Sequence, residues 1–336
     1  MKLLIVTQSV DRNDPVLGFF HRWIEEFSKH YEWVTVIALR VGDYALPDNV
    51  TVLSLKQTES QSKMRTALRF LTLIYTNRTQ YEKVLVHMNP EYIVLGGLLW
   101  RLLGKRTGLW YTHKHTGIRL RIAVLLSHVV FTASRASFRL ETKKLHVMGH
   151  GIDWPQFLRK TRAEGAPLHI VTVGRVSATK RIREMLQGLD VLAKRGTSFT
   201  FSIVGAPATQ SDTVYQESLM QDVSNHTYPI EFRGPVRHAQ LPELLSTADI
   251  FLNLSSTGSL DKAVLEALCA GVSVVSSNEA FEELLRPYGL QLDSVRPGDI
   301  ADGIERALYT DSTALSARVR KEHSLSELIP AILRSL

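Results

Sequence analysis

Positive side chains gather where a strand gives way to a helix in the segment TVGRVSATKRIREML. The strand is predicted to end at Gly174, Arg175 follows at once, and a helix is predicted to begin near Thr179 with Lys180 in its first turn. Cations are disfavoured at a helix N-terminus, because the helix dipole is positive there. A bound anion would explain the arrangement, since backbone N–H groups and the two side chains would converge on a phosphate. A solvated basic helix face explains the same pattern.

The carboxylate of Glu266 lies among apolar residues in the segment NLSSTGSLDKAVLEALCAGVSVVSS. A helix is predicted to start near Ser259 or Leu260, with Ser259 as its N-cap, and Glu266 lies two turns into it. The Ser/Thr/Gly-rich loop before the helix could form an anion-binding nest of N–H groups. A buried carboxylate needs a partner. A ribose diol would supply one, as in dinucleotide sites, and a neighbouring Lys or Arg would do so equally well.

His113, His115 and Cys269 have side chains that could bind a metal or act in catalysis. His113 and His115 in YTHKHTG could share a face of a strand, but no Cys, Asp or Glu lies close by to complete a metal site, so none is predicted. For His113, a substrate-facing role and a plain loop or core role both stay open. Cys269, the single cysteine, lies among apolar residues and is predicted to be a buried core residue rather than a nucleophile.

The elements that must position these residues alternate between short apolar runs and amphipathic helical segments. The apolar runs of the first half are KLLIVT, WVTVIAL, KVLVH, GLWYTH and VVFTAS, and those of the second half are LHIVTVG, SFTFSIVG, IEFRG, DIFLNL and VSVVSS. Strands that alternate with helices predict parallel βαβ units and a doubly wound sheet in each half. Such sheets bind ligands at the carboxyl ends of their strands, where both segments described above are expected to lie.

The alternation is interrupted near mid-chain by HGIDWPQFLRKTRAEGAP, which is predicted to be a linker. The chain has 336 residues, more than one hydrophobic core usually supports. The sequence therefore predicts an α/β protein with two Rossmann-like domains, residues 1–155 and 165–324, facing each other across a cleft. A last helix, about 325–336, could pack back on the first domain.

Charge is divided unevenly between the two halves. Residues 1–155 contain 21 Lys and Arg against 12 Asp and Glu, whereas residues 156–336 contain 19 against 21. A basic domain can bind nucleic acid, anionic lipid or a phosphorylated substrate. No nucleic-acid-binding motif accompanies the basic residues, so nucleic-acid binding is not expected. The absence of a signal-peptide pattern and of a bilayer-length apolar run predicts a cytoplasmic protein.

Four segments in order resemble the retaining glycosyltransferases of family 4, which have the GT-B architecture of two Rossmann-like domains. The segments are HGIDWPQF, TVGRVSATKRIREML, IEFRGPVRHAQLPELLSTADIFLNLS and LEALCAGVSVVSS, and together they cover most of residues 147–280. The order and spacing of the whole set carry the resemblance. The first half of the chain resembles the family mainly in its strand–helix rhythm.

The resemblance implies a role for each matching residue. Arg175 and Lys180 would neutralise the donor diphosphate as it leaves, and Glu266 would bind the ribose. His113 would approach the donor sugar, and Gly18, in the loop after the first strand, would lie near the phosphates. Further donor-binding positions are expected at Gly174, Gly234, Val236, Ser259, Leu260, Asp261 and Lys262, with Gly234 to Val236 passing the nucleobase.

Two positions depart from the family's pattern. The family has a first Glu eight residues before the second, where it contacts the donor sugar, and this chain has Gly258 there. The identity of the donor sugar is therefore open; Asp261 could supply a carboxylate and Lys262 a phosphate contact instead. The loop after the first strand reads PVLGFFHRW, where many members have adjacent glycines. Phe19 and Phe20 could narrow the site or could begin a core-packed helix.

The activity that the resemblance implies is transfer of a sugar from a nucleoside diphosphate sugar, with a UDP or GDP carrier, to an acceptor hydroxyl with retention of configuration. No metal and no cofactor is expected, because Arg175 and Lys180 supply the neutralising charge. A nucleotide-sugar epimerase of the same architecture and a catalytically inactive sugar-nucleotide-binding homologue are the alternatives.

The acceptor, a glycan or a lipid-linked sugar, is expected on the basic first domain. The segments SKMRTALRFLTLIYTNR and LLWRLLGKR mix Leu, Phe and Trp with Arg and Lys. They could rest as a peripheral contact on the anionic inner face of a membrane. A core-facing helix with a solvated basic side explains the same composition.

Overall fold

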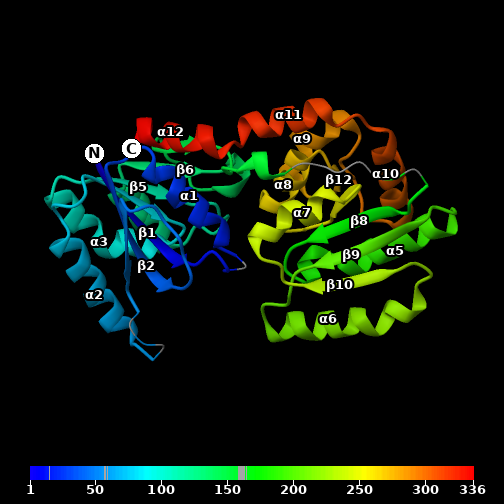
Figure 1. Cartoon of the computed structure of the whole chain (residues 1–336), viewed down its shortest axis with the longest axis horizontal. Helices are drawn as coiled ribbons and strands as arrows, with labels where there is room; N and C mark the ends of the chain where they lie inside the picture. The colour runs from blue at the N-terminus through cyan, green and yellow to red at the C-terminus, as the bar shows by residue number, and fades with distance from the viewer. Residues whose placement is uncertain (15, 57, 59, 158–162, 164) are drawn as a thin grey trace. The chain divides into compact units, whose positions relative to one another are not determined.

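The computed structural model describes residues 1–336 except 15, 57, 59, 158–162 and 164 (Figure 1). Its residues form two compact units, Met1–Asp153 with His323–Leu336 and Trp154–Glu322. The predicted domains were 1–155 and 165–324, so the chain leaves the first unit within the predicted linker and returns to it for the last helix. The rest of that linker lies partly outside the described residues.

The first unit is a seven-stranded parallel sheet with helices on both faces. The strands stand in the order β3-β2-β1-β4-β5-β6-β7, so the chain reverses its direction of travel across the sheet between β1 and β4. The elements are β1 (Lys2–Val10), α1 (Gly18–Ser28), β2 (Trp33–Val41), β3 (Val50–Ser54), α2 (Lys63–Thr76), β4 (Lys83–His87), α3 (Pro90–Leu102), β5 (Arg106–Trp110), α4 (Ile118–Leu126), β6 (Val129–Thr132), β7 (Leu145–Val147) and α12 (Leu325–Ser335).

Alternate residues of the central strand β1 pack into two separate cores. Leu3 and Ile5 belong to the core that α1 and α12 cover, and Leu4 and Val6 belong to the core under α2, α3 and α4. Both faces of the strand are apolar, as parallel sheets require when helices cover them on both sides. Figure 1 shows α12, in red, beside α1, in blue, at the chain's other end.

The second unit is a five-stranded parallel sheet in the order β10-β9-β8-β11-β12, with its reversal between β8 and β11. The sheet and its helices consist of β8 (Leu168–Val173), α5 (Ile182–Lys194), β9 (Phe199–Val204), α6 (Gln210–Asp222), β10 (Ile230–Gly234), α7 (Leu241–Ser246), β11 (Ile250–Asn253), α8 (Lys262–Ala270), β12 (Ser273–Ser276), α9 (Glu282–Leu285), α10 (Pro297–Tyr309) and α11 (Thr313–Glu322). Two Rossmann-like α/β units are the architecture that the sequence predicted. In an open parallel sheet the reversal point is the preferred ligand site.

No helix in the described part of the chain has the length and apolar composition needed to cross a bilayer.

Candidate functional site

Three glycines bring the carboxyl ends of β8, β9 and β10 close together. Gly205 donates its N–H to the Gly234 carbonyl at 2.8 Å, and Gly174 donates to Val204 at 2.9 Å. Gly174 and Gly205 have φ values of +147° and +142°, which favour glycine. A Cβ on Gly205 would lie 1.8 Å from the Gly174 carbonyl oxygen. The strand ends can therefore meet only because these positions lack side chains.

Lys180 lies on a short turn in front of α5 rather than in the first turn of that helix. A 3₁₀ turn spans Ala178–Lys180, Arg181 has a left-handed φ of +55°, and α5 begins at Ile182. The predicted helix start near Thr179 was therefore wrong, because the left-handed residue separates the turn from the helix. The Lys180 side chain runs over Gly174, with Cε 3.2 Å from the position that a Cβ on Gly174 would take.

A polar network at the reversal point holds the ammonium group of Lys180. Lys180 Nζ donates to Asp261 Oδ2 at 2.9 Å, and the same oxygen accepts from Asn253 Nδ2 at 2.9 Å. Asn253 Oδ1 in turn accepts from Ser276 Oγ at 3.1 Å. The network joins the turn after β8 to the ends of β11 and β12. Since Asn253 and Ser276 are buried, it positions Lys180 firmly.

Arg175 is held far more loosely than Lys180. Its side chain is 55% exposed, and its guanidinium lies 4.0 Å from Asp212 Oδ2, at the limit of an ion pair. Arg183, another basic residue of the segment TVGRVSATKRIREML, pairs with Asp222 on α6 at 2.7 Å. The basic residues of this segment thus have different surroundings: Arg183 is paired with α6, and Arg175 keeps an exposed charge near the end of β8.

Helix α8 begins at Lys262, with Asp261 as its N-cap residue. The prediction of Ser259 as N-cap was wrong, because the chain stays extended at Asp261 after Gly258 adopts a left-handed φ of +59°. The Ser259 carbonyl instead accepts a hydrogen bond from Asn278 Nδ2 at 2.8 Å. Leu260, which is half-buried, lies between Ser259 and Asp261. Glu266 consequently lies about one turn into α8, not two.

Glu266 is 2% exposed and has two cationic or potentially cationic neighbours. His238 Nε2 lies 2.8 Å from Glu266 Oε1, and Lys262 Nζ lies 3.4 Å from the same oxygen. Burial opposes ionisation of this carboxyl group, but the charge of Lys262 and the hydrogen bond with His238 outweigh burial and hold the pKa of Glu266 below its ordinary value. The carboxylate is therefore an anion near neutral pH.

Glu266 has a neighbouring Lys as a partner, which is one of the two alternatives that the sequence left open. Lys262, four residues earlier on the same helix, is the neighbouring Lys that could neutralise it, and helical spacing alone signalled this pair. His238 was missed, because no periodicity connects the turn after β10 with α8. Asn253 was missed as well; its only signal is its place at the carboxyl end of a predicted strand.

Gly234 and Val236 lie in the same turn as His238. Gly234 ends β10 with a φ of +67°, and Val236 is half-buried two residues later. Their proximity to a nucleobase stays a prediction. The structure does bring this turn to Glu266, because His238 contacts the Glu266 carboxylate.

Gly18 and the two phenylalanines that follow it lie at the start of α1. Gly18 is the buried first residue of α1, and a Cβ there would lie 3.0 Å from the Arg12 carbonyl oxygen. Phe20 is fully buried and Phe19 packs against the same core, so the two rings begin a core-packed helix.

His113 lines a cavity of about 400 Å³, with Asn89, Glu91 and Arg119 among the other lining residues. The surrounding protein displaces part of its hydration and lowers the pKa of His113 below its ordinary value. The imidazole is therefore neutral near pH 7 and could exchange hydrogen bonds with a ligand. Its role toward a donor sugar stays a prediction.

Neither metal coordination nor thiol chemistry is indicated in the residues that the structure describes. Within them, no group of three or more His, Cys, Asp and Glu side chains is arranged to hold a metal ion. Cys269 is fully buried in α8, and burial raises the pKa of its thiol to about 12. The cysteine is a core residue, as the sequence predicted.

Comparison with known proteins shows that the second half of the chain is similar in sequence to glycosyltransferases. Residues 167–310 match the family described as Glycosyl transferases group 1. The chain is 27% identical over 144 residues to the putative colanic acid biosynthesis glycosyltransferase WcaL of Salmonella typhimurium, an alignment that covers 40% of this chain and 34% of WcaL. It is 29% identical over 138 residues to glycogen synthase of Mycobacterium tuberculosis, covering 40% of this chain and 32% of the synthase. The chain thus matches about a third of the length of each relative.

The fold of the whole chain is similar to that of solved GT-B glycosyltransferases. The crystal structure of Anabaena Alr3699/HepE in complex with UDP and glucose aligns with a TM-score of 0.75 and 16% sequence identity, covering 100% of this chain and 99% of that chain. The fold is accordingly of the GT-B type. All the site residues from Gly174 to Glu266 lie inside the range that matches the glycosyltransferase family.

Proposed function

We propose that this chain is a glycosyltransferase that moves a sugar from a nucleoside diphosphate sugar to an acceptor hydroxyl with retention of configuration. The observation that carries the proposal is the network in which Asp261 and Asn253 hold Lys180 over Gly174, at the reversal point of a sheet whose sequence matches glycosyltransferases. Ligands of open parallel sheets bind at this point.

In the proposed reaction the bond between the anomeric carbon and the diphosphate oxygen breaks, and a bond from that carbon to the acceptor oxygen forms on the same face. The acceptor proton passes to the departing diphosphate. Lys180 uses one of its three N–H donors on Asp261 and keeps the others for phosphate oxygens. Because negative charge grows on the diphosphate as it leaves, Lys180 and Arg175 stabilise the transition state more than the bound donor. The proposal requires no metal or cofactor.

Glu266 is proposed to bind the ribose of the donor. The shortest contacts of His238 and Lys262 are both to Oε1, which leaves Oε2 as the freer oxygen to accept from a ribose hydroxyl. The carboxylate is an anion and is fixed on α8, so it can accept a hydroxyl hydrogen without rearrangement. A UDP-sugar is the first donor to test, since HepE was crystallised with UDP and glucose.

The proposal is tested by incubating the full chain with UDP-glucose, UDP-galactose and GDP-mannose and measuring release of the nucleoside diphosphate. Arg175→Ala and Lys180→Ala are each expected to lower turnover by about 10²- to 10³-fold, the usual cost of removing one electrostatic stabiliser. Arg183→Ala, whose guanidinium faces Asp222 on α6, is the matched control and should retain activity.

Three results would contradict the assignment. Near-normal turnover in both Arg175→Ala and Lys180→Ala would remove the two cations from the mechanism. Interconversion of the sugar on its nucleotide would identify an epimerase. Nucleotide binding with neither transfer nor slow hydrolysis would identify an inactive homologue, in which Gly258 replaces the family's sugar-contacting Glu.

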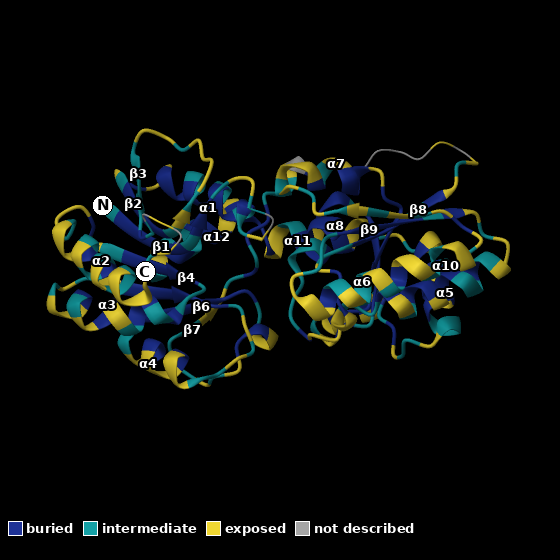
Figure 2. Ribbon diagram, turned by 90° about the horizontal axis from the view of Figure 1, so that it is seen from below, coloured by how far each residue is buried: buried dark blue, intermediate teal, exposed yellow. Residues whose placement is uncertain are grey.

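We propose further that the chain binds its acceptor at an anionic membrane. The outer faces of α2, α3 and α4 would contact that membrane. Of the 17 large apolar side chains exposed in the described part of the chain, nine lie on these three helices. Figure 2 shows exposed residues, in yellow, along α2, α3 and α4. They are Met64, Leu68, Tyr75, Leu95, Leu98, Leu102, Ile118, Ile122 and Leu125. We call these nine residues the α2–α4 surface.

The charges of these three helices suit an anionic membrane. They carry six Lys and Arg residues and a single acid, Glu91, which pairs with Arg119 at 3.1 Å. The helices do pack on the core, through Phe70 and Trp100 for example, as the alternative interpretation of the sequence expected. Their opposite sides nevertheless expose apolar residues among cations, a composition typical of interfacial binding.

Vesicle co-sedimentation tests the membrane proposal. The protein is expected to bind vesicles that contain phosphatidylglycerol and to bind phosphatidylcholine vesicles weakly. Leu98→Glu with Leu102→Glu should reduce that binding about tenfold, because two apolar contacts are replaced by repelled charges. Tyr309→Glu, at an 89% exposed position outside this surface, is the control. Equal binding by both variants would contradict the proposal.

A further inference from the structure

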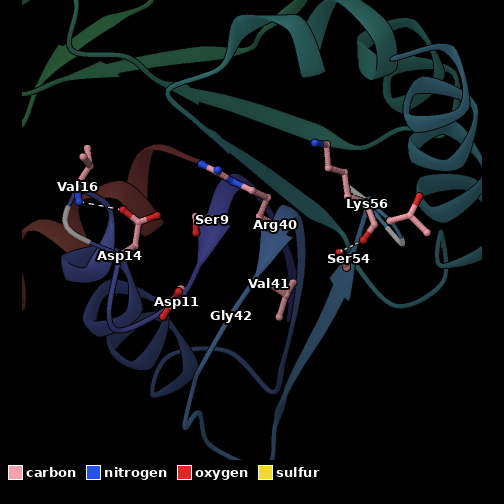
Figure 3. A pocket seen from close by; sticks show the side chains of 10 residues that line it. Ser9, Asp11, Asp14, Val16, Arg40, Val41, Gly42, Ser54 and Lys56 are labelled. Carbon is pink, nitrogen blue, oxygen red and sulfur yellow. Dashed lines mark hydrogen bonds between the residues drawn. The ribbon is translucent and has the colours of Figure 1, made fainter. Parts of the chain in front are cut away.

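A polar hollow of about 620 Å³ lies in the first unit, at the carboxyl ends of β1, β2 and β3 (Figure 3). These strands stand on one side of the reversal point between β1 and β4. The carboxyl ends of parallel strands are where such sheets bind ligands. No residue that we assigned to the donor lines this hollow.

Arg40 supplies an unused positive charge to the hollow. Its side chain is exposed, and within the described residues it makes no hydrogen bond, ion pair or ring contact. Lys56, half-buried, also lines the hollow. In Figure 3 the Arg40 guanidinium extends above Ser9, and Lys56 projects from the opposite wall. A guanidinium left without a protein partner in a concave site suits a carboxylate or a phosphate.

Ser9 adds a hydroxyl group to the wall of the hollow. Its residue is 4% exposed and pairs with Arg40 in the register of β1 and β2, and its hydroxyl has no hydrogen bond within the described residues. A hydroxyl group can both donate and accept a hydrogen bond. A ligand oxygen or a water in the hollow would satisfy Ser9.

Two carboxylates on the same wall supply hydrogen-bond acceptors. Asp14 Oδ1 accepts from the N–H groups of Val16 and Leu17, and Asp11 Oδ1 accepts from that of Asn13. These bonds fix both side chains while engaging only one oxygen of each. The second oxygens can accept from sugar hydroxyls, which is a common use of Asp in saccharide binding. A site for a bare anion would not place two carboxylates beside the cations.

We infer that this hollow binds the acceptor and that the acceptor unit seated in it is an anionic saccharide, whose carboxylate or phosphate meets Arg40 while its hydroxyls meet Asp11 and Asp14. That the ligand is an acceptor rests on the proposed glycosyltransferase function. The inference goes beyond that function by naming the substrate class. The Arg40 guanidinium, which has no partner within the described residues, and the two fixed carboxylates beside it carry the inference.

Ligand-observed NMR titration of the full chain with glucuronate, glucose 6-phosphate, glucose and inorganic phosphate tests the inference. At least one of the two anionic sugars is expected to bind ten times more tightly than glucose and than inorganic phosphate. Arg40→Gln should remove that preference, and Ser9→Ala should weaken it. Arg139→Gln is the matched control, since Arg139 is an exposed arginine of the same unit with no partner within the described residues.

The outcomes separate this inference from the proposed function. Glucuronate binding alone identifies a carboxylate-bearing sugar, and glucose 6-phosphate binding alone a phosphorylated one; both support the inference. The inference is overturned if glucose or inorganic phosphate binds as tightly as the anionic sugars, or if neither anionic sugar binds. It is also overturned if Arg40→Gln leaves the preference for the anionic sugars unchanged. UDP titrated into the same samples reports on the donor site, so its failure to bind would instead count against the proposed function.

Discussion

Lys180 and Glu266 carry opposite charges in the second unit, and each is held by a residue distant in sequence. Asp261 holds Lys180 and His238 contacts Glu266, at 2.9 and 2.8 Å. Half-buried ion pairs with additional hydrogen bonds fix side chains more firmly than exposed pairs do. Both groups are therefore positioned before any ligand arrives, which lowers the cost of binding one.

Glu266→Gln is expected to lower the free energy of unfolding by about 3 kcal/mol at pH 7, because it replaces the buried anion that His238 and Lys262 contact with a neutral amide. Since the pKa of Glu266 is lowered by folding, its ionisation stabilises the protein above the ordinary carboxyl value of about 4.3. That stabilisation is lost as the pH falls through the lowered pKa. Thermal unfolding should therefore show a gap between wild type and variant that narrows below about pH 4.

The exposed Glu217 on α6 provides the control for this pH dependence. Glu217→Gln should match the wild type across the whole pH range. A constant gap for Glu266→Gln between pH 7 and pH 3.5 would mean that its charge contributes nothing to stability.

Gly258 stands where the resemblance to family 4 places a first Glu, and its backbone angles disfavour that residue. With φ at +59°, a Glu there would adopt a left-handed conformation that costs about 1 kcal/mol. Gly258→Glu is expected to lower stability by that amount, measured by urea unfolding. Gly258→Asn should lower it less, because Asn tolerates this conformation. Equal effects of the two substitutions would contradict the conformational explanation.

At the scale of elements, left-handed residues decide where two site helices begin. Arg181 precedes α5, and Gly258 lies three residues before the N-cap of α8. Both helices start two or three residues later than the sequence predicted. Apolar periodicity along the chain reports the buried face of a helix but not the backbone angles in front of it.

The close approach of Gly174 and Gly205 is the feature that brings the ends of β8 and β9 together. Gly205→Ala is expected to lower the free energy of unfolding by about 3 kcal/mol, because its Cβ would collide with a backbone carbonyl that cannot move freely. Gly196→Ala is the matched control: it also has a positive φ, of +87°, but its Cβ would meet nothing within 4 Å. It should cost about 1 kcal/mol. Chemical denaturation measures both; equal costs would show that the collision relaxes.

At the scale of the whole molecule, the last helix completes the first unit. Leu328 and Ile329 of α12 belong to the same core as Phe20 and Trp23 of α1, although some 300 residues separate them along the chain. The N-terminal half of the sequence therefore lacks part of its own core until α12 is present. Stability must be measured for each unit, since a chain of two units need not unfold in one step.

Leu328→Ala is expected to cost about 3 kcal/mol and to reduce hydrogen-exchange protection in β1 and β2 while leaving β8 and β9 unchanged. The matched control is Leu315→Ala in α11, a fully buried leucine of the second unit, which should give the opposite pattern. Loss of protection in both units for either variant would contradict the division of the chain.

Sequence alone determined the class of fold and the segments that build the candidate site. Runs of apolar residues and their spacing are local properties of the chain, so they report strands buried on both faces and the alternation that makes parallel sheets. The segments around Arg175, Lys180 and Glu266 were located in the same way. The roles of these residues toward a donor, and the cleft expected between the domains, are predictions for the experiments above.

Tertiary structure alone decided which partners the charged residues have. The pairs Lys180–Asp261 and Glu266–His238 join positions 81 and 28 residues apart, and the lone guanidinium of Arg40 is defined only by what surrounds it. Such contacts depend on which strand ends lie side by side and on where a glycine lets two backbones meet. Neither follows from the order of residues along a strand, because side-chain neighbours across a sheet are set by the packing of the entire fold.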